Sequence, residues 1–242
     1  TVDQVYAYMR QDILPKTSQV AISDTYETFQ QMLQQDEDLL YLSFSAKMSG
    51  TYALVDRVMK ELAPTYPQRK MIALDAKGGS FATGLIAMQA SELAEQGAVI
   101  ETVAERCRFL IDHVEHVFVI SDLKWMVWGG RISRTMGYTA DLLNIKPVLD
   151  VQDGEMEVIR KVHGTRNSLR CVADLVAERA VKCPQQMIGI THADDPQKAE
   201  EMRQLLQERL PQCTFAITEI GAVLGVHIGI GGVGVFFFNQ MQ

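Results

Sequence analysis

Short apolar runs alternate with longer amphipathic stretches along this chain, and this alternation limits the possible folds more than any other feature. Apolar runs occupy residues 39–42, 71–74 and 117–120, lengths typical of buried strands. Thr102 and Glu105 form a capping-box pattern, which predicts the start of a helix. Continuous apolar strands between helices predict a parallel sheet covered on both faces. The helical patterns between these strands cover residues 52–62, 80–95 and 102–114.

The second half of the chain adds a hairpin. Residues 148–151 and 155–162 flank Asp153-Gly154, a strong signal for a tight turn between antiparallel strands. Helical and strand patterns then alternate again and end in an apolar run at 233–238, which predicts a mixed sheet. We therefore expect an α/β protein of two domains, with a parallel sheet flanked by helices in the first and a mixed sheet with helices in the second. The boundary is expected near residue 115, which gives domains of residues 1–115 and 116–242.

Composition excludes several classes of function. The net charge is −7 and only 7% of residues are aromatic, so neither the cationic field nor the stacking surface of a nucleic-acid-binding protein is expected. The four cysteines are widely separated, without Cys/His spacing that would predict a metal site. The sequence shows no signal peptide, and no apolar run approaches the ~20 residues that span a bilayer. We expect a cytoplasmic protein.

Two polar segments have the chemistry to hold an anion. Thr17 and Ser18 lie in a loop, where hydroxyl groups most often make turns and caps. Ser49-Gly50-Thr51 follows a predicted strand and precedes a predicted helix, a position where free N–H groups and the helix dipole favour an anion. Gly50 would let a ligand approach the backbone closely. On the residues alone, anion binding and a structural turn are equally supported for this segment.

Three further positions stand out. Arg131 follows a pair of glycines and could meet a carboxylate, a phosphate or one of the protein's own acids. The function of Lys146, directly before Pro147, is left open. His227 lies among glycines that allow close approach to its ring, whereas His116 has no such setting and is expected to be structural. We find no acid–histidine–nucleophile order typical of a hydrolase.

The order of these segments resembles the DegV family of bacterial fatty-acid-binding proteins, the lipid-carrying subunits of fatty acid kinase. The matching segments span residues 15 to 231, nearly the whole chain. They are Thr17-Ser18-Gln19, Ser49-Gly50-Thr51-Tyr52, Gly129-Gly130-Arg131-Ile132, Asn144-Ile145-Lys146-Pro147 and His227-x-Gly229-x-Gly231.

The resemblance implies two α/β domains and a long-chain fatty acid as ligand, with no cofactor, no metal and no catalytic residue in this chain. It implies that Thr17, Ser18, Ser49 and Gly50 bind the carboxylate together with His227, and that Arg131 lies near the head group or faces the partner. That partner is a separate ATP-dependent kinase subunit, which converts the bound acid to an acyl phosphate. Transient contact with a membrane is compatible with this role.

The chain departs from the family pattern in places. Family members begin with a strand carrying a Thr-Asp-Ser motif, which does not precede the matching segments here, so the resemblance implies a truncated or processed chain whose first sheet lacks a strand. Ile230 stands where the family has proline.

Two other hypotheses for the function remain. One is an enzyme acting on a small anionic substrate through Ser49 and His227, which requires these side chains within hydrogen-bond reach. The other is a structural or regulatory module without a pocket.

Overall fold

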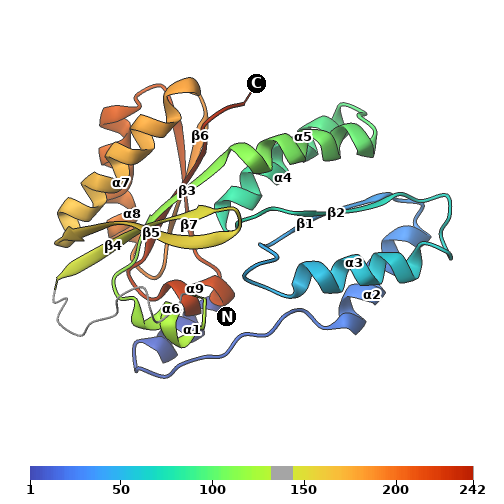
Figure 1. The fold of residues 1–242 in the computed structure, drawn as a ribbon, viewed down its shortest axis with the longest axis horizontal. Helices are drawn as coiled ribbons and strands as arrows, with labels where there is room; N and C mark the ends of the chain where they lie inside the picture. The colour runs from blue at the N-terminus through green and yellow to red at the C-terminus, as the bar shows by residue number, and fades with distance from the viewer. Residues whose placement is uncertain (132–143, 242) are drawn as a thin grey trace.

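The protein is described by a computed structural model that covers residues 1–131 and 144–241 (Figure 1). The strands in these ranges are β1 (Leu39–Ser43), β2 (Met71–Asp75), β3 (Val114–Val119), β4 (Ile145–Gln152), β5 (Glu155–His163), β6 (Met187–His192), β7 (Thr214–Glu219) and β8 (Val233–Phe238). The helices are α1 (Val2–Met9), α2 (Ile22–Gln34), α3 (Thr51–Leu62), α4 (Phe81–Glu95), α5 (Ile100–His113), α6 (Lys124–Trp128), α7 (Thr165–Arg179), the 3₁₀ helix η2 (Ala180–Lys182), α8 (Pro196–Arg209) and α9 (Ala222–Ile228).

A two-stranded parallel sheet, β1 and β2, lies between two helical layers (Figure 1). Side chains alternate along each strand: Leu39 packs with α2 and α3 on one face, and Leu40 and Leu42 pack with α4 and α5 on the other. Burial on both faces explains why these strands read as continuous apolar runs. The predicted parallel sheet flanked by helices is confirmed.

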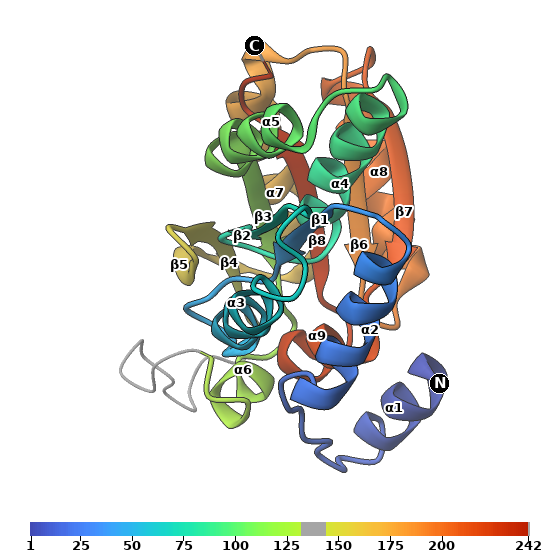
Figure 2. The same cartoon turned by 90° about the vertical axis from the view of Figure 1, so that its right-hand side faces the viewer.

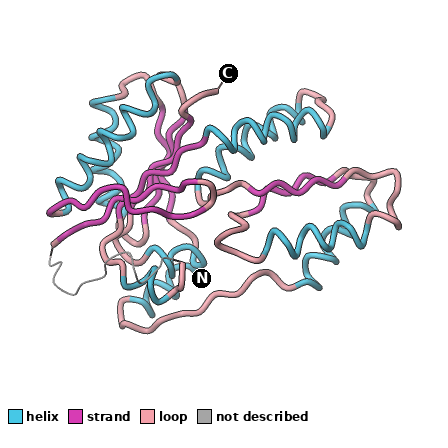
Figure 3. The backbone as a smooth tube through the Cα atoms, viewed as in Figure 1, coloured by secondary structure: helices cyan, strands magenta, loops and turns pink. Residues whose placement is uncertain are grey.

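The second sheet has six strands in the order β5-β4-β3-β8-β6-β7. Its β6–β7 pair is parallel and its other pairs are antiparallel, so the predicted mixed sheet is confirmed. The backbone trace in Figure 3 shows the other strands of this sheet passing behind the β4–β5 hairpin. The last strand of the described chain, β8, lies between β3 and β6 and is hydrogen-bonded to both.

The two faces of the six-stranded sheet have different covers. Val235 and Phe237 of β8 point into a core formed with α7 and α8. Phe236 and Phe238 point the other way and pack with α4 and α5. These two helices cover only part of that face, and the remainder faces the loops that follow β1 and β2.

Three short helices, α1, α6 and α9, gather at one end of the molecule (Figure 2). Tyr6 of α1 is buried against Trp125 of α6 and Val226 of α9, and its hydroxyl donates a hydrogen bond to the Ile220 carbonyl at 2.8 Å. Residues 10–21 connect this cluster to α2 and run along the edge of the molecule (Figure 1). This connection carries Thr17 and Ser18.

Two local predictions have opposite outcomes. The hairpin forms as expected, with Asp153 and Gly154 both at positive φ, 45° and 87°. The capping box at Thr102 is wrong, because α5 already begins at Ile100 after an extended Val99 without a side-chain cap. Packing of the apolar residues at this end, rather than a cap, sets the start of the helix.

The expected domain boundary near residue 115 falls within β3, and the division into two domains stays a prediction.

Candidate functional site

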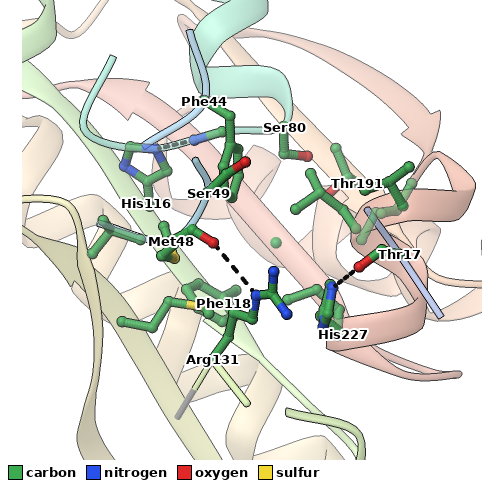
Figure 4. Close-up of a pocket in the computed structure, with 18 of the residues that line it drawn as sticks. Thr17, Phe44, Met48, Ser49, Ser80, His116, Phe118, Arg131, Thr191 and His227 are labelled. Atoms are coloured by element: carbon green, nitrogen blue, oxygen red, sulfur yellow. Dashed lines mark hydrogen bonds between the residues drawn. The ribbon is translucent and has the colours of Figure 1, made fainter. Parts of the chain in front are cut away.

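A cavity of about 290 Å³ lies between the uncovered face of the six-stranded sheet and the loops that follow β1 and β2 (Figure 4). This volume is near the lower end of the roughly 300–1,000 Å³ usual for ligand sites. Most of the lining is apolar and comes from several elements. It comprises Thr17, Ser18, Val20, Phe44, Met48, Ser49, Thr51, Gly79, Ser80, His116, Phe118, Arg131, Val151, Met156, Thr191, Ile220, Val223, Leu224, His227, Ile228, Val233, Gly234 and Phe236.

The sheet supplies the floor of this cavity through every second residue of its strands, the residues whose side chains point to this face. His116 and Phe118 of β3 pair with Phe236 and Gly234 of β8, and Gly234 also pairs with Thr191 of β6. A Cβ on Gly234 would lie 2.9 Å from Phe236 Cζ and 3.2 Å from Thr191 Oγ1. The missing side chain therefore keeps the centre of the floor open.

Thr17 and His227 meet at one part of the wall. Thr17 Oγ1 and His227 Nε2 share a hydrogen bond of 2.9 Å (Figure 4). The imidazole is only 8% exposed, and it packs so closely on Gly129 that a Cβ there would collide with Nδ1. The pKa of His227 is lowered, first by burial and then by the Arg131 charge, so the neutral ring is favoured.

The start of α3 brings Ser49 to the same cavity. Ser49 Oγ accepts a hydrogen bond from the Thr51 backbone N–H at 3.2 Å and donates one to Thr51 Oγ1 at 3.0 Å. The hydroxyl group is thus held beside the first turn of the helix, where N–H groups have no intrahelical partner. Gly50 is the N-cap of α3, but it is not part of the cavity lining; a Cβ there would collide with the Gln19 side chain.

Arg131 brings the positive charge of this site. Its guanidinium donates to the Gly129 carbonyl at 2.6 Å and to the Met48 carbonyl at 3.4 Å (Figure 4). The residue is exposed yet lines the cavity, so its charge can act at the opening. The described residues offer it no carboxylate within salt-bridge distance, and it retains N–H donors for an anion.

His116 lies on the cavity wall, which the sequence did not predict. The expectation that His116 is structural stays a prediction. It is 5% exposed, its Nε2 accepts a hydrogen bond from the Gly79 N–H at 3.4 Å, and its ring meets Phe236 edge-on. Burial lowers its pKa from 6.5 to about 4, so the ring is neutral at pH 7. These contacts join residues remote in sequence, and only the strand alternation with Phe118 hinted at them.

Five of the predicted site residues, namely Thr17, Ser18, Ser49, Arg131 and His227, line one cavity. Lys146, whose function was left open, donates a hydrogen bond to the Ser121 carbonyl at 3.0 Å. Sequence reasoning missed Ser80, Thr191 and the methionines of the wall. No motif marks them, since they lie in an ordinary loop, a strand and a hairpin.

The hydrogen bonds of Ser49 and His227 bear on the alternative of an enzyme that uses both side chains. Ser49 is bonded to Thr51 and His227 to Thr17, and no hydrogen bond joins Ser49 to His227 in the described ranges. Within the same ranges, His227 Nδ1 has no hydrogen-bond partner that would orient the ring for base catalysis. Neither a cluster of three His, Cys, Asp or Glu suited to a metal nor a helix able to cross a membrane occurs in residues 1–131 and 144–241.

Comparison with known proteins gives a consistent result. A family model described as the DegV family of uncharacterised proteins matches residues 1–240. A DegV domain-containing protein of Clostridium perfringens is 33% identical over 98% of this chain and 82% of its own length.

Two Thermotoga maritima proteins are also similar. One, named a fatty acid-binding protein, is 29% identical over 91% of this chain and 76% of its own length. The crystal structure of a DegV lipid binding protein superimposes with a TM-score of 0.87 at 26% identity, over 100% of this chain and 84% of that one.

Proposed function

We propose that this chain, which belongs to the DegV family, binds one long-chain fatty acid in the cavity and holds its carboxylate beside Thr17 and Ser49. The observation that carries the proposal is a mostly apolar cavity with a hydrogen-bonded hydroxyl–imidazole pair, a helix start and the Arg131 guanidinium on its wall. The similar fatty acid-binding and lipid binding proteins of Thermotoga maritima support it.

The head group would be held by a short chain of hydrogen bonds. Neutral His227 donates from Nε2 to Thr17 Oγ1, which leaves the Thr17 hydroxyl hydrogen for the carboxylate. The Ser49 hydroxyl can turn from Thr51 to the same carboxylate while its oxygen keeps the Thr51 N–H. Ser18 and the backbone amide of Gly50 complete the proposed set, with Gly50 reached at the edge of the cavity.

Most of the affinity would come from the tail. Burying roughly 14 methylene groups at ~0.8 kcal/mol each gives about 11 kcal/mol, whereas each hydrogen bond to a carboxylate adds only about 1.5–3 kcal/mol. The wall offers Met48, Phe118 and Met156 to the chain. The hydroxyl groups would therefore set the position of the carboxylate rather than the affinity.

A fixed carboxylate at an accessible edge suits a carrier. We propose that the chain is non-catalytic and that a separate ATP-dependent kinase subunit phosphorylates the bound acid. Arg131 supports this part of the proposal, because it is exposed at the opening and has no carboxylate partner among the described residues that would compete with a phosphoryl group. Transient membrane contact during loading stays a prediction.

Mass spectrometry of the purified protein tests the proposal. Native spectra should show one bound molecule, and denaturation should release a long-chain fatty acid at a 1:1 ratio. Delipidated protein should regain that mass when the acid is added. A protein that arrives empty and takes up no added fatty acid would refute the proposed function.

A further inference from the structure

Thr191 is a buried polar residue of the cavity that the proposed carboxylate site does not use. It lies on β6, is 2% exposed, and its hydroxyl has no hydrogen-bond partner within residues 1–131 and 144–241. The side chain lines the cavity. A buried hydroxyl group without a partner has lost its hydrogen bonds to water and gained none in return, so a ligand atom that bonded it would gain in affinity.

The start of α4 lies next to Thr191. Phe81, the first residue of α4, packs so closely on β6 that a Cβ at Gly189 would collide with its ring. Gly189 and Thr191 are two residues apart and therefore share one face of the strand. The α4 N-terminus thus sits over the part of β6 that carries the Thr191 hydroxyl, and Figure 4 shows Ser80 and Thr191 on the same side of the cavity.

The start of α4 has no side-chain cap among the described residues. Ser80 precedes α4 at a φ of 59°, lines the cavity, and does not cap the helix with its hydroxyl. The first N–H groups of a helix have no intrahelical acceptor, and the helix dipole adds partial positive charge there. Ser80 and Thr191 form a patch of hydroxyl groups beside the first turn of α4, which we call the α4 patch, on an otherwise mostly apolar wall.

From the α4 patch we infer that the preferred ligand is a long-chain acid carrying an oxygen on its chain, a hydroxy or oxo fatty acid. This inference rests on the proposed function, since the carboxylate is placed at Thr17 and Ser49. The chain oxygen then accepts hydrogen bonds from the α4 patch, and a plain alkyl chain leaves the Thr191 hydroxyl without a partner.

Competition by native mass spectrometry tests this inference. Delipidated protein is offered octadecanoic acid together with one monohydroxy or oxo derivative of it, in a series that moves the oxygen along the chain. Because the patch is fixed, the preference should peak at one oxygen position, where we expect about three- to tenfold selection over the plain acid. A flat series, or preference for the plain acid throughout, would overturn the inference while leaving the proposed function intact.

Two matched variants assign the selection to the patch. Thr191→Val removes the hydroxyl at nearly constant shape and should reduce the peak preference to about one, with octadecanoic acid still retained. Thr83→Val makes the same change at another unpartnered buried hydroxyl, in α4 but outside the cavity lining, and should keep the preference. Unchanged selection in Thr191→Val would contradict the assignment. If the delipidated wild-type protein bound none of the offered acids, both proposals would be overturned.

Discussion

Thr17 and His227 share a hydrogen bond of 2.9 Å although 210 positions separate them in the chain. One residue lies in the connection between α1 and α2, and the other lies in α9 near the last strand. The bond ties a segment without regular structure to the buried wall of the cavity. The ring position of His227 therefore decides where the Thr17 hydroxyl is held.

Gly129→Ala should disturb this pair without touching either residue. A new Cβ would collide with His227 Nδ1, so the ring must move away and the bond to Thr17 should break. We expect acyl-phosphate formation by the cognate kinase to fall more than lipid retention in native mass spectra, because the tail keeps most of the affinity. Gly84→Ala is the matched control, because nothing lies within 4 Å of its added Cβ; it should retain lipid and stabilise α4 by about 0.5–1 kcal/mol. Equal acyl-phosphate formation in both variants would contradict the proposed role of His227.

Ser49→Ala should lower acyl-phosphate formation by the cognate kinase more than it lowers lipid retention. The tail keeps most of the affinity, while the lost hydroxyl group no longer fixes the carboxylate. Ser49→Thr retains the hydroxyl group and should keep most of the wild-type rate of acyl-phosphate formation. The measurement is phosphorylation of pre-loaded protein, with bound lipid quantified in parallel. If both quantities fell by the same factor, the hydroxyl would contribute affinity rather than orientation.

Acid should destabilise the protein through His116. Its folded pKa of about 4 lies below the usual histidine value of 6.5, so the unfolded chain binds the proton first as pH falls. The stabilisation by the neutral ring is complete above about pH 6.5 and is lost on going down to about pH 4, a change of about 3 kcal/mol in the unfolding free energy.

His116→Gln removes this titration while leaving an oxygen that can accept the Gly79 N–H. Its unfolding free energy should depend less steeply on pH between 4 and 6.5, as measured by denaturant titration at several pH values. His163→Gln, at an exposed position, should keep the wild-type slope. An unchanged slope in His116→Gln would show that other groups control the acid sensitivity.

Ser45→Ala should loosen the cavity wall formed by the β4–β5 hairpin. The buried Ser45 hydroxyl donates a 2.6 Å hydrogen bond to the Gly154 carbonyl at the turn, and the variant leaves that carbonyl unpaired. We expect a loss of about 1–3 kcal/mol in stability and faster release of bound lipid, because Val151 and Met156 line the cavity from the hairpin.

Lys47→Ala provides the comparison for Ser45→Ala at the same turn. It removes ion pairs to Asp153 and Glu155, but these are exposed and screened by solvent, so they should contribute little to stability. Thermal unfolding and exchange against labelled fatty acid measure both effects. Similar behaviour of the two variants would mean that the hydrogen bond does not hold the wall.

The sequence predicted those features that depend on local pattern. Apolar runs located the strands, and Asp153-Gly154 located the hairpin with both residues at positive φ. The first helix was missed although Thr1 and Gln4 form a capping box that the structure contains. Thr102 and Glu105 show the converse, a local pattern overridden by packing at the start of α5.

The candidate site was predictable only where it coincides with motifs. Thr17, Ser49 and His227 were found through the resemblance, and the structure brings them to one cavity. His116 and Thr191 were not found, because their position depends on which face of each strand is left uncovered by α4 and α5. Which face stays uncovered follows from the packing of helices that are distant in the chain, and the sequence of a single strand gives no information about that packing.

The central position of β8 has a consequence for biosynthesis. Before β8 emerges from the ribosome, β3-β4-β5 and β6-β7 can pair only as two separate groups, each with an open edge. The cavity floor, which needs His116, Thr191 and Gly234 side by side, can form only when this late segment inserts between them. Such non-local pairing is slow and leaves strand edges exposed in the meantime. Nascent chains should therefore be incompetent for ligand until synthesis has passed β8, and dependent on chaperones until then.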